Sequence, residues 1–441
     1  MASNKVSAAR WSAFEILRRV EDGAFSSVLL ATEEAKLQAS DRALCHELVL
    51  GVLRWQLKLD RIIEHYANRK ITSLDRSVLI ALRIGLYQLR FLTRVPASAA
   101  VDESVKLVQA ARLSSARAFV NAVLRRATRE PEYEPTANIS DSLERLTVES
   151  SHPRWLIERW IDSFGIEETK AFVRSNNQTP PATFRVVQTR ANENEVINRL
   201  EAAGIKLQAS ELVSSAWRAS NVNPVLRALA DKGEIYFQDE ASQLVAESVG
   251  AQDGDYILDL CAAPGGKTSL IADRVPNVRL VASDLSERRL AIVSKTIAVQ
   301  DLKQVSLTVV DASQPLPFRA ESFDRILVDA PCSGTGTLAR NPEIRWRIAP
   351  EDIHRLATQQ LEILSNASKV VKQGGRLIYS TCSVEREENE DVVAKFLRGN
   401  NHFRQVPLKS RSGLMTEGGA LRTWPQHQRT DGFFVTALLK C

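Results

Sequence analysis

Apolar and polar positions alternate with a helical period over the first third of the chain. Trp11, Phe14 and Leu17 recur on one predicted helix face, with Arg18 and Arg19 outside it. The same period continues to about residue 130, which predicts a compact all-α domain over residues 1–135. Its helices are expected around 11–20 and at 40–55, 57–67, 75–91, 97–111 and 114–129.

A different pattern begins at residue 238, where short apolar runs alternate with helical stretches. Such alternation favours a mostly parallel sheet in a doubly wound, Rossmann-like α/β domain over residues 238–441. Strands are expected at 256–260, 279–283, 305–310, 323–328, 376–380, 403–407 and 432–439, and helices at 240–249, 267–274, 287–299, 350–372 and 386–398.

The intervening residues have weaker periodicity. A Pro- and Glu-rich linker at 131–140 precedes a predicted small α+β module over 141–237. Its helices are expected at 153–164, 167–175 and 193–203, and its strands at 182–188 and 234–237. The chain is therefore predicted to be multidomain, with three successive parts.

Composition narrows the class of protein. The 441 residues are 44% hydrophobic and 25% charged, as in soluble globular proteins. An apolar run of about 18 residues is lacking, and the N-terminus does not read as a signal peptide. The five cysteines lack the spacing of a zinc site or a disulfide framework. We expect a cytoplasmic protein with neither membrane nor metal among its partners, acting as a monomer.

Positive charge is concentrated in the predicted helical domain. Residues 1–135 carry 21 Lys/Arg against 15 Asp/Glu, whereas the remainder carries 37 against 38. Arg117, Asn121 and Arg125 are spaced to share one helix face, and Arg126 adjoins them. These four residues are candidates for binding RNA phosphates. An ordinary solvated basic face remains the alternative.

The expected cofactor site lies at the carboxyl ends of the first strands of the α/β domain. The run 256–260 ends in a turn and is followed by a predicted helix. The turn contains neither GxGxxG nor a phosphate loop, since Ala263 occupies the position of that loop's first glycine. Asp259, Asp284 and Asp311 follow three successive strands. Acids there suit ribose hydroxyls and an adenine amino group, which favours S-adenosylmethionine over a pyrophosphate cofactor.

Two further strand ends carry cysteines in polar loops. Cys332 follows Asp329 in Asp-Ala-Pro-Cys, and Cys382 lies in Ser-Thr-Cys-Ser. A thiolate that adds to C6 of a pyrimidine makes C5 nucleophilic toward a methyl donor. Asp329 could hydrogen-bond the base and favour cytosine, which must reach the pocket unstacked. These residues alone do not decide which cysteine is the nucleophile. For Cys261, in the cofactor loop, close packing is the expected role.

Residues 238–441 resemble the Sun/Fmu family of RNA 5-methylcytosine methyltransferases. The resemblance rests on Gln238–Ser242, Cys261–Lys267, Asp329–Gly334, Thr381–Ser383 and Asp431–Phe434. Residues 4–130 resemble the RNA-binding NusB domain, and this fusion is typical of the family's bacterial small-subunit (16S) rRNA enzyme.

The resemblance implies a role for each matching residue. It implies that Cys382 is the nucleophile, that Cys332 aids product release and that Asp329 stabilises the base adduct. It also implies that S-adenosylmethionine is bound by Cys261, Ala262, Ala263, Pro264, Gly265, Gly266, Lys267, Asp284, Asp311 and Asp329.

Other functions stay open at this point. A DNA cytosine-5 methyltransferase would use the Pro-Cys motif, but it needs neither Thr-Cys nor a NusB-like domain. The RNA could instead be a tRNA or large-subunit rRNA. A non-catalytic RNA-binding or ribosome-assembly factor is disfavoured by the retained cysteines and strand-end acids. A thiol hydrolase is disfavoured because His354, the nearest histidine in sequence, is expected to cap a helix or lie at the surface.

Overall fold

The computed structural model describes residues 6–34, 36–409 and 413–441. The chain divides into two compact units. The first unit extends to Thr179 and also includes Leu338–Arg347; the second comprises Pro180–Thr337 and Ile348–Cys441. Among the described residues, no helix is both long enough and apolar enough to span a membrane.

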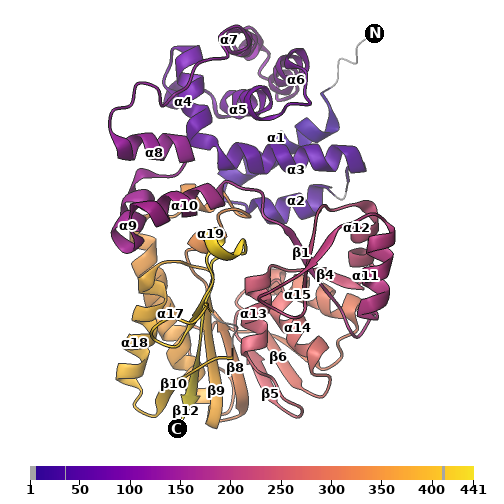
Figure 1. Cartoon of the computed structure of the whole chain (residues 1–441), viewed down its shortest axis with the longest axis vertical. Coiled ribbons are helices and arrows are strands. Elements are labelled where there is room, and N and C mark those ends of the chain that lie inside the picture. Colours follow the sequence, from indigo (N-terminus) through magenta and orange to yellow (C-terminus); the bar gives the residue numbers. More distant parts are fainter. Residues whose placement is uncertain (1–5, 35, 410–412) are drawn as a thin grey trace. The chain divides into compact units, whose positions relative to one another are not determined.

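The first unit is entirely helical in its described part (Figure 1). Its largest core is formed by the apolar faces of seven helices. These are α1 (Ala8–Glu21), α2 (Ser26–Glu34), α3 (Ala39–Arg54), α4 (Gln56–Ala67), α5 (Arg76–Phe91), α6 (Ala97–Ala110) and α7 (Arg117–Arg129). The predicted helices are confirmed, while α2 was not predicted. Asp75 caps α5 by accepting hydrogen bonds from the backbone N–H groups of Ser77 and Val78, at 2.8 and 3.2 Å.

Three more helices complete this unit: α8 (Ser142–Ser150), α9 (Arg154–Phe164) and α10 (Ile166–Asn176). Trp160 of α9 is fully buried and packs edge-on against Phe172 of α10, with ring centroids 4.8 Å apart. α8–α10 fall in the first unit, and the strands predicted for the α+β module fall in the second.

The segment Leu338–Arg347 is distant in sequence from the rest of the helical unit. It contains the short helix α16 (Ile344–Arg347). Arg345 is fully buried and donates hydrogen bonds to the Ser151 carbonyl oxygen at 3.1 Å and to Asn177 Oδ1 at 3.0 Å. Glu343 accepts from the backbone N–H and the hydroxyl of Ser26, at 2.8 and 2.9 Å. This docking was not predicted from the sequence.

The second unit begins with a four-stranded antiparallel sheet of order β2-β3-β1-β4. Two helices connect its strands in a β-α-β-β-α-β sequence, which is the ferredoxin-like arrangement. The elements are β1 (Ala182–Val186), α11 (Glu193–Ala202), β2 (Leu207–Ala209), β3 (Ala216–Ala219), α12 (Pro224–Asp231) and β4 (Ile235–Phe237). β2, β3 and α12 were not predicted because each is short.

The main sheet has the order β10-β12-β9-β8-β5-β6-β7, and β11 pairs with β12 (Figure 1). β5 to β9 are parallel, while β10 and β12 pair antiparallel at one side. The strands are β5 (Tyr256–Asp259), β6 (Arg279–Asp284), β7 (Val305–Val309), β8 (Phe323–Asp329), β9 (Val371–Thr381), β10 (Phe403–Val406), β11 (Leu421–Arg422) and β12 (Phe434–Lys440). The predicted mostly parallel sheet is confirmed.

Helices follow most of the parallel strands, as the sequence predicted. They are α13 (Glu240–Ser248), α14 (Gly266–Arg274), α15 (Glu287–Gln300), α17 (Pro350–Val370) and α18 (Glu390–Gly399), with the four-residue α19 (Pro425–Gln428) near the end of the chain. The prediction that a helix extends to residue 372 was wrong, because β9 already begins at Val371. An irregularity in the pairing of β8 with β9 accommodates Gly374, whose φ is +73°.

Arg185 of β1 joins the ferredoxin-like sheet to the α/β part of the second unit. Its guanidinium is fully buried and donates hydrogen bonds to Ser269 Oγ at 2.8 Å and Gln238 Oε1 at 3.1 Å. It also pairs with Asp273 at 3.4 Å. Burial lowers the pKa of Arg185 to about 10, so it remains charged at neutral pH.

We expect Arg185→Ala to lower the free energy of unfolding by about 3–5 kcal/mol, because the buried Asp273 carboxylate would lose its charged partner. Chemical denaturation of the full chain measures this change. Arg199→Ala is the control, since Arg199 pairs with Glu234 at a side-chain exposure of 51%, and it should cost less than about 1 kcal/mol. Equal losses in the two variants would contradict the assigned importance of Arg185.

Candidate active site

The loop after β5 forms a tight turn at the start of α14. The backbone N–H of Gly265 donates to the Ala262 carbonyl oxygen at 2.7 Å, and Gly265 has φ +102°. A residue with a Cβ would be strained there, which explains the glycine. The backbone N–H of Ala262 donates to the Ser283 carbonyl oxygen at 2.8 Å. This bond holds the loop against the end of β6.

Asp259 is the last residue of β5, directly before this loop. Its carboxyl group is buried and accepts a hydrogen bond from Thr268 Oγ1 at 2.6 Å, while Oδ1 lacks a hydrogen-bond partner within the described part of the chain. Burial raises its pKa to about 7, and the nearby Asp329 acts in the same direction. Asp259 is therefore a structural acid with one oxygen left to pair.

Asp284 and Asp311 occupy different environments. Asp284 is buried at the end of β6, where Oδ2 accepts from the backbone N–H of Ala263 at 3.3 Å. Arg289 of α15 donates to Asp284 Oδ1 at 3.3 Å and to the Ala263 carbonyl oxygen at 3.1 Å. Asp311 is exposed beyond β7 and accepts from Ser313 Oγ at 2.6 Å. Hydrogen bonds thus join Asp284 to the loop 261–267, whereas among the described residues Asp311 makes neither a hydrogen bond nor an ion pair to that loop.

Asp329 lies at the end of β8 with both oxygens engaged. Lys267 Nζ donates to Oδ2 and Ser380 Oγ donates to Oδ1, each at 2.7 Å. The Lys267 ammonium also lies 5.0 Å from the centroid of the Phe433 ring. Burial alone would lower the pKa of Lys267, but Asp329 outweighs this effect and the pKa is raised. The ion pair therefore fixes the Asp329 carboxylate beside the cofactor loop.

The structure brings the two candidate cysteines together. Cys332 Sγ and Cys382 Sγ are 3.2 Å apart, and the backbone N–H of Cys382 donates to Cys332 Sγ at 3.3 Å. Hydrogen bonding to Cys382, together with burial, raises the pKa of Cys332 well above its ordinary value. Burial also raises the pKa of Cys261, as expected of a packed thiol rather than a nucleophile.

Backbone contacts fix the loops that carry these thiols. The N–H of Gly336 donates to the Cys382 carbonyl oxygen at 3.0 Å, and the N–H of Gly432 donates to the Gly336 carbonyl oxygen at 2.8 Å. A Cβ on Gly336 would lie 2.0 Å from the carbonyl oxygen of Gly432. The close approach of three backbone segments therefore requires glycine at this position.

Glu388 connects the two cysteine loops, and sequence reasoning missed it. Ser333, the residue after Cys332, donates its N–H to Glu388 Oε1 at 2.8 Å and its hydroxyl to Oε2. Ser383, the residue after Cys382, donates its hydroxyl to the same Oε2. Burial raises the pKa of this carboxyl group, whereas the hydrogen bonds it accepts lower it. The available sequence signal was an acid six residues after a motif cysteine, which is too weak to assign.

The residues around this strand edge fit a nucleoside-containing cofactor. Asp284 is an acid of the type that holds ribose hydroxyls, and the loop presents backbone groups beside it. The orphan Oδ1 of the buried Asp259 leaves one acceptor for a donor group. The described residues contain no cluster of three or more His, Cys, Asp or Glu side chains arranged for a metal ion.

The predicted RNA-binding residues lie on α7 in the helical unit. Arg117 is exposed, and Arg125 Nε donates to Asn121 Oδ1 at 2.9 Å. Arg126 pairs with Glu130 at 3.1 Å. None of these contacts involves a ligand, so RNA binding by these four residues stays a prediction.

A mostly parallel sheet with acids at its strand ends fits an S-adenosylmethionine-dependent methyltransferase, and the comparisons show that class and specify which kind. Residues 246–439 match the family described as 16S rRNA methyltransferase RsmB/F. Residues 7–129 match the NusB family, and residues 152–225 match the ferredoxin-like domain of RsmF/B-like methyltransferases. The chain belongs to the RsmB/F family of rRNA methyltransferases.

Similar proteins span the whole chain. The "Probable ribosomal RNA small subunit methyltransferase B" of Bacillus subtilis (strain 168) is 34% identical over 450 residues, covering 99% of each chain. The crystal structure of PH0851 is 29% identical with a TM-score of 0.87, covering 99% of this chain and 100% of that one. A methyltransferase homologue from Pyrococcus horikoshii is 25% identical with a TM-score of 0.60, covering 69% and 100%. The NusB-like and methyltransferase folds expected from the sequence are confirmed.

We expect Glu388→Gln to lower kcat for methyl transfer about a hundredfold, as displacements of about 1 Å in an active site can do. The amide offers one acceptor oxygen where the carboxylate offers two, so either the Ser333 N–H or the two serine hydroxyls would lose their acceptor. Initial-rate kinetics with labelled cofactor and rRNA measure kcat and KM, and thermal unfolding checks that the fold persists.

Glu362→Gln is the matched control, because Glu362 is exposed on α17. It should leave kcat unchanged. If Glu388→Gln also kept the original kcat, Glu388 would not be needed to position the cysteine loops.

Proposed function

We propose that this protein transfers a methyl group from S-adenosylmethionine to C5 of a cytosine in 16S rRNA through a covalent cysteine adduct. The observation that carries the proposal is the pair of thiols, 3.2 Å apart, at the ends of the neighbouring strands β8 and β9. The names of the similar proteins support small-subunit rRNA as the substrate. A bacterial enzyme acting on that RNA would work in the cytoplasm.

The cofactor would be held by the loop 261–267 with Asp284, Asp311 and Asp329. Asp284 would accept from the ribose hydroxyl groups and Asp311 from the adenine amino group, each as a hydrogen-bond acceptor. When bound, S-adenosylmethionine supplies an electrophilic methyl group for C5. Lys267 would hold the Asp329 carboxylate in place, because their ion pair is largely shielded from water.

In this proposal the Cys382 thiolate adds to C6 of the cytosine and forms an S–C6 bond, which makes C5 nucleophilic. Asp329 would stabilise the adduct by hydrogen bonding at the N3 and amino edge of the base. After C5 has gained the methyl group, a base takes the C5 proton and passes it to solvent water. The electrons of that C–H bond re-form the C5–C6 double bond, so the S–C6 bond breaks and Cys382 leaves as a thiolate. Cys332 Sγ lies 3.2 Å from Cys382 Sγ, within reach to hydrogen-bond the leaving sulfur. The assignment of the two roles follows the family resemblance of the Thr-Cys and Pro-Cys motifs.

We expect Cys382→Ala to abolish methyl transfer to 16S rRNA, because no thiolate would add to C6. Transfer of labelled methyl groups, with 5-methylcytosine mapped in 16S rRNA, 23S rRNA and tRNA, measures the loss and identifies the RNA substrate. Cys441→Ala is the control, since Cys441 is exposed at the C-terminus. Activity retained by Cys382→Ala would refute its assignment as nucleophile, whereas labelling confined to another RNA would refute the assigned substrate.

We expect Cys332→Ala to accumulate a covalent protein–RNA adduct, because release of Cys382 would be slowed while adduct formation continues. Denaturing gels of the variant incubated with cofactor and labelled rRNA detect the adduct as a slowly migrating band. The band should vanish in the double variant Cys332→Ala/Cys382→Ala. If the adduct instead formed only in Cys382→Ala, the roles of the two cysteines would be reversed.

A further inference from the structure

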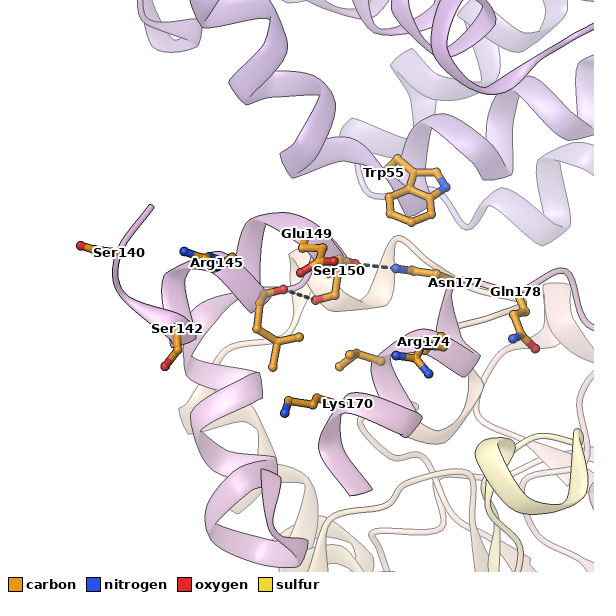
Figure 2. A pocket seen from close by; sticks show the side chains of 12 residues that line it. Trp55, Ser140, Ser142, Arg145, Glu149, Ser150, Lys170, Arg174, Asn177 and Gln178 are labelled. Atoms are coloured by element: carbon orange, nitrogen blue, oxygen red, sulfur yellow. Dashed lines mark hydrogen bonds between the residues drawn. The ribbon is translucent and has the colours of Figure 1, made fainter. Parts of the chain in front are cut away.

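A cavity of about 620 Å³ lies in the helical unit, where it is lined by α8, α10 and the corner between α3 and α4 (Figure 2). Small-molecule sites range from about 300 to 1,000 Å³, so its size suits a ligand. On α10 and its C-cap, the lining positions Lys170, Val173, Arg174 and Asn177 follow the spacing of one helix face. The face thus places two cations around an apolar centre.

The facing helix, α8, lines the cavity with the same spacing. Ser142, Arg145, Leu146 and Glu149 contribute hydroxyl, cationic, apolar and acidic groups respectively. Among the described residues that line the cavity, Glu149 is the single acid against three cations. This charge balance favours an anionic ligand.

Trp55 lies at the corner between α3 and α4 and supplies the aromatic part of the lining. Its indole stacks on Phe91 with ring centroids 5.1 Å apart, and Phe91 stacks in turn on Tyr87 at 5.0 Å. The indole is half-buried, and Figure 2 shows it extending toward α8 and α10. A planar base could therefore stack on an aromatic group whose orientation is already fixed.

The three cationic side chains that line the cavity differ in whether they already have a hydrogen-bond or ion-pair partner in the protein. Arg145 Nε donates to the Ile139 carbonyl oxygen at 3.1 Å, and Lys170 pairs with Glu167 at 2.8 Å in an exposed contact. The exposed Arg174 guanidinium makes neither a hydrogen bond nor an ion pair to any residue the structure describes. An exposed ion pair such as Lys170–Glu167 is weak and is readily exchanged for a phosphate.

Hydrogen bonds already hold the wall of the cavity beside Lys170 and Arg174. Asn177 Nδ2 donates to the Ser150 carbonyl oxygen at 2.6 Å, and Asn177 Oδ1 accepts from the buried Arg345 at 3.0 Å. α10 is thereby tied both to α8 and to the segment Leu338–Arg347. A site whose walls are fixed before binding loses less conformational entropy when a ligand is bound.

We propose that this cavity binds an unpaired nucleotide of the RNA substrate, with its base against Trp55 and its phosphates at Lys170 and Arg174. An aromatic platform beside cations is the combination that binds single-stranded nucleic acid. The inference rests on the proposed action on rRNA and adds a second RNA site, in the helical unit, apart from the two cysteines. The predicted residues on α7 do not line this cavity.

Two full-length variants test the site on a 16S rRNA transcript: Lys170→Ala/Arg174→Ala and Trp55→Leu. The double variant should reduce the slope of log K against log salt by about 1.4, since each phosphate contact on a single strand contributes about 0.7. Trp55→Leu should weaken binding by about five- to a hundredfold at constant salt, the range for loss of one base stack. Thermal unfolding verifies that each variant is folded. Arg18→Ala is the control, because Arg18 pairs with Glu15 at 48% exposure and does not line the cavity.

Measurements of methyl transfer distinguish a failure of the proposed RNA site from a failure of the proposed function. In both variants KM for the RNA should rise while kcat at saturating RNA stays unchanged, and 4-thiouridine in the RNA should crosslink to peptides of α8 or α10. An unchanged salt slope and KM with full activity would overturn the RNA site and leave the proposed function standing. Crosslinks in these peptides without methylation of any cytosine would support the site and refute the proposed function. If an acidic peptide bound here and left RNA affinity unaffected, the occupant proposed would be wrong.

Discussion

The parallel register of β8 with β9 is the constraint on which the reactive site depends. Asp329 pairs with Ser380 at the ends of these strands, so the residues that follow them emerge side by side. Cys332 and Cys382 consequently meet although they are 50 positions apart in the sequence. A slip of one residue would turn the side chains of a strand to the opposite face of the sheet. Pairing is irregular between Phe323 and Arg325, before this register is established. The irregularity accommodates Gly374 in β9, so the ends of β8 and β9 that carry the site stay aligned.

Burial of acids is the second physical feature of the site. A buried carboxyl group costs free energy unless hydrogen bonds or a counter-charge compensate it. Glu388 is compensated by hydroxyl and amide donors from both cysteine loops, which makes an otherwise unfavourable group a connection between them. Asp329 is compensated by Lys267, and the resulting ion pair orients the carboxylate. Asp259 is compensated only in part, and its pKa of about 7 reflects that. The ends of β5 and β8 therefore carry one acid with a raised pKa, Asp259, and one acid paired with a lysine, Asp329.

The sequence predicted those features that depend on residues close to one another along the chain. The turn at Gly265 was evident from the loop motif, the strand ends from short apolar runs, and α3 to α7 from helical periodicity. Glu388 was missed because its function arises from two loops that meet only in the folded sheet. The docking of Leu338–Arg347 was missed for the same reason, since Arg345 donates to oxygens of Ser151 and Asn177, which lie far from it in the sequence. The role of Asp311 stays a prediction: the sequence identified its position after a strand, and its side chain is exposed.

The segment Leu338–Arg347 gives the chain an unusual connectivity. The polypeptide leaves the second unit just after the Pro-Cys loop, contributes α16 to the helical unit, and returns to begin α17. Arg345 is wholly buried there, and burial lowers its pKa to about 9 while carbonyl and amide oxygens accept its hydrogen bonds. Removing this segment from the helical unit would leave those oxygens without the donor that now satisfies them. The loop of Cys332 is therefore covalently continuous with an anchored segment.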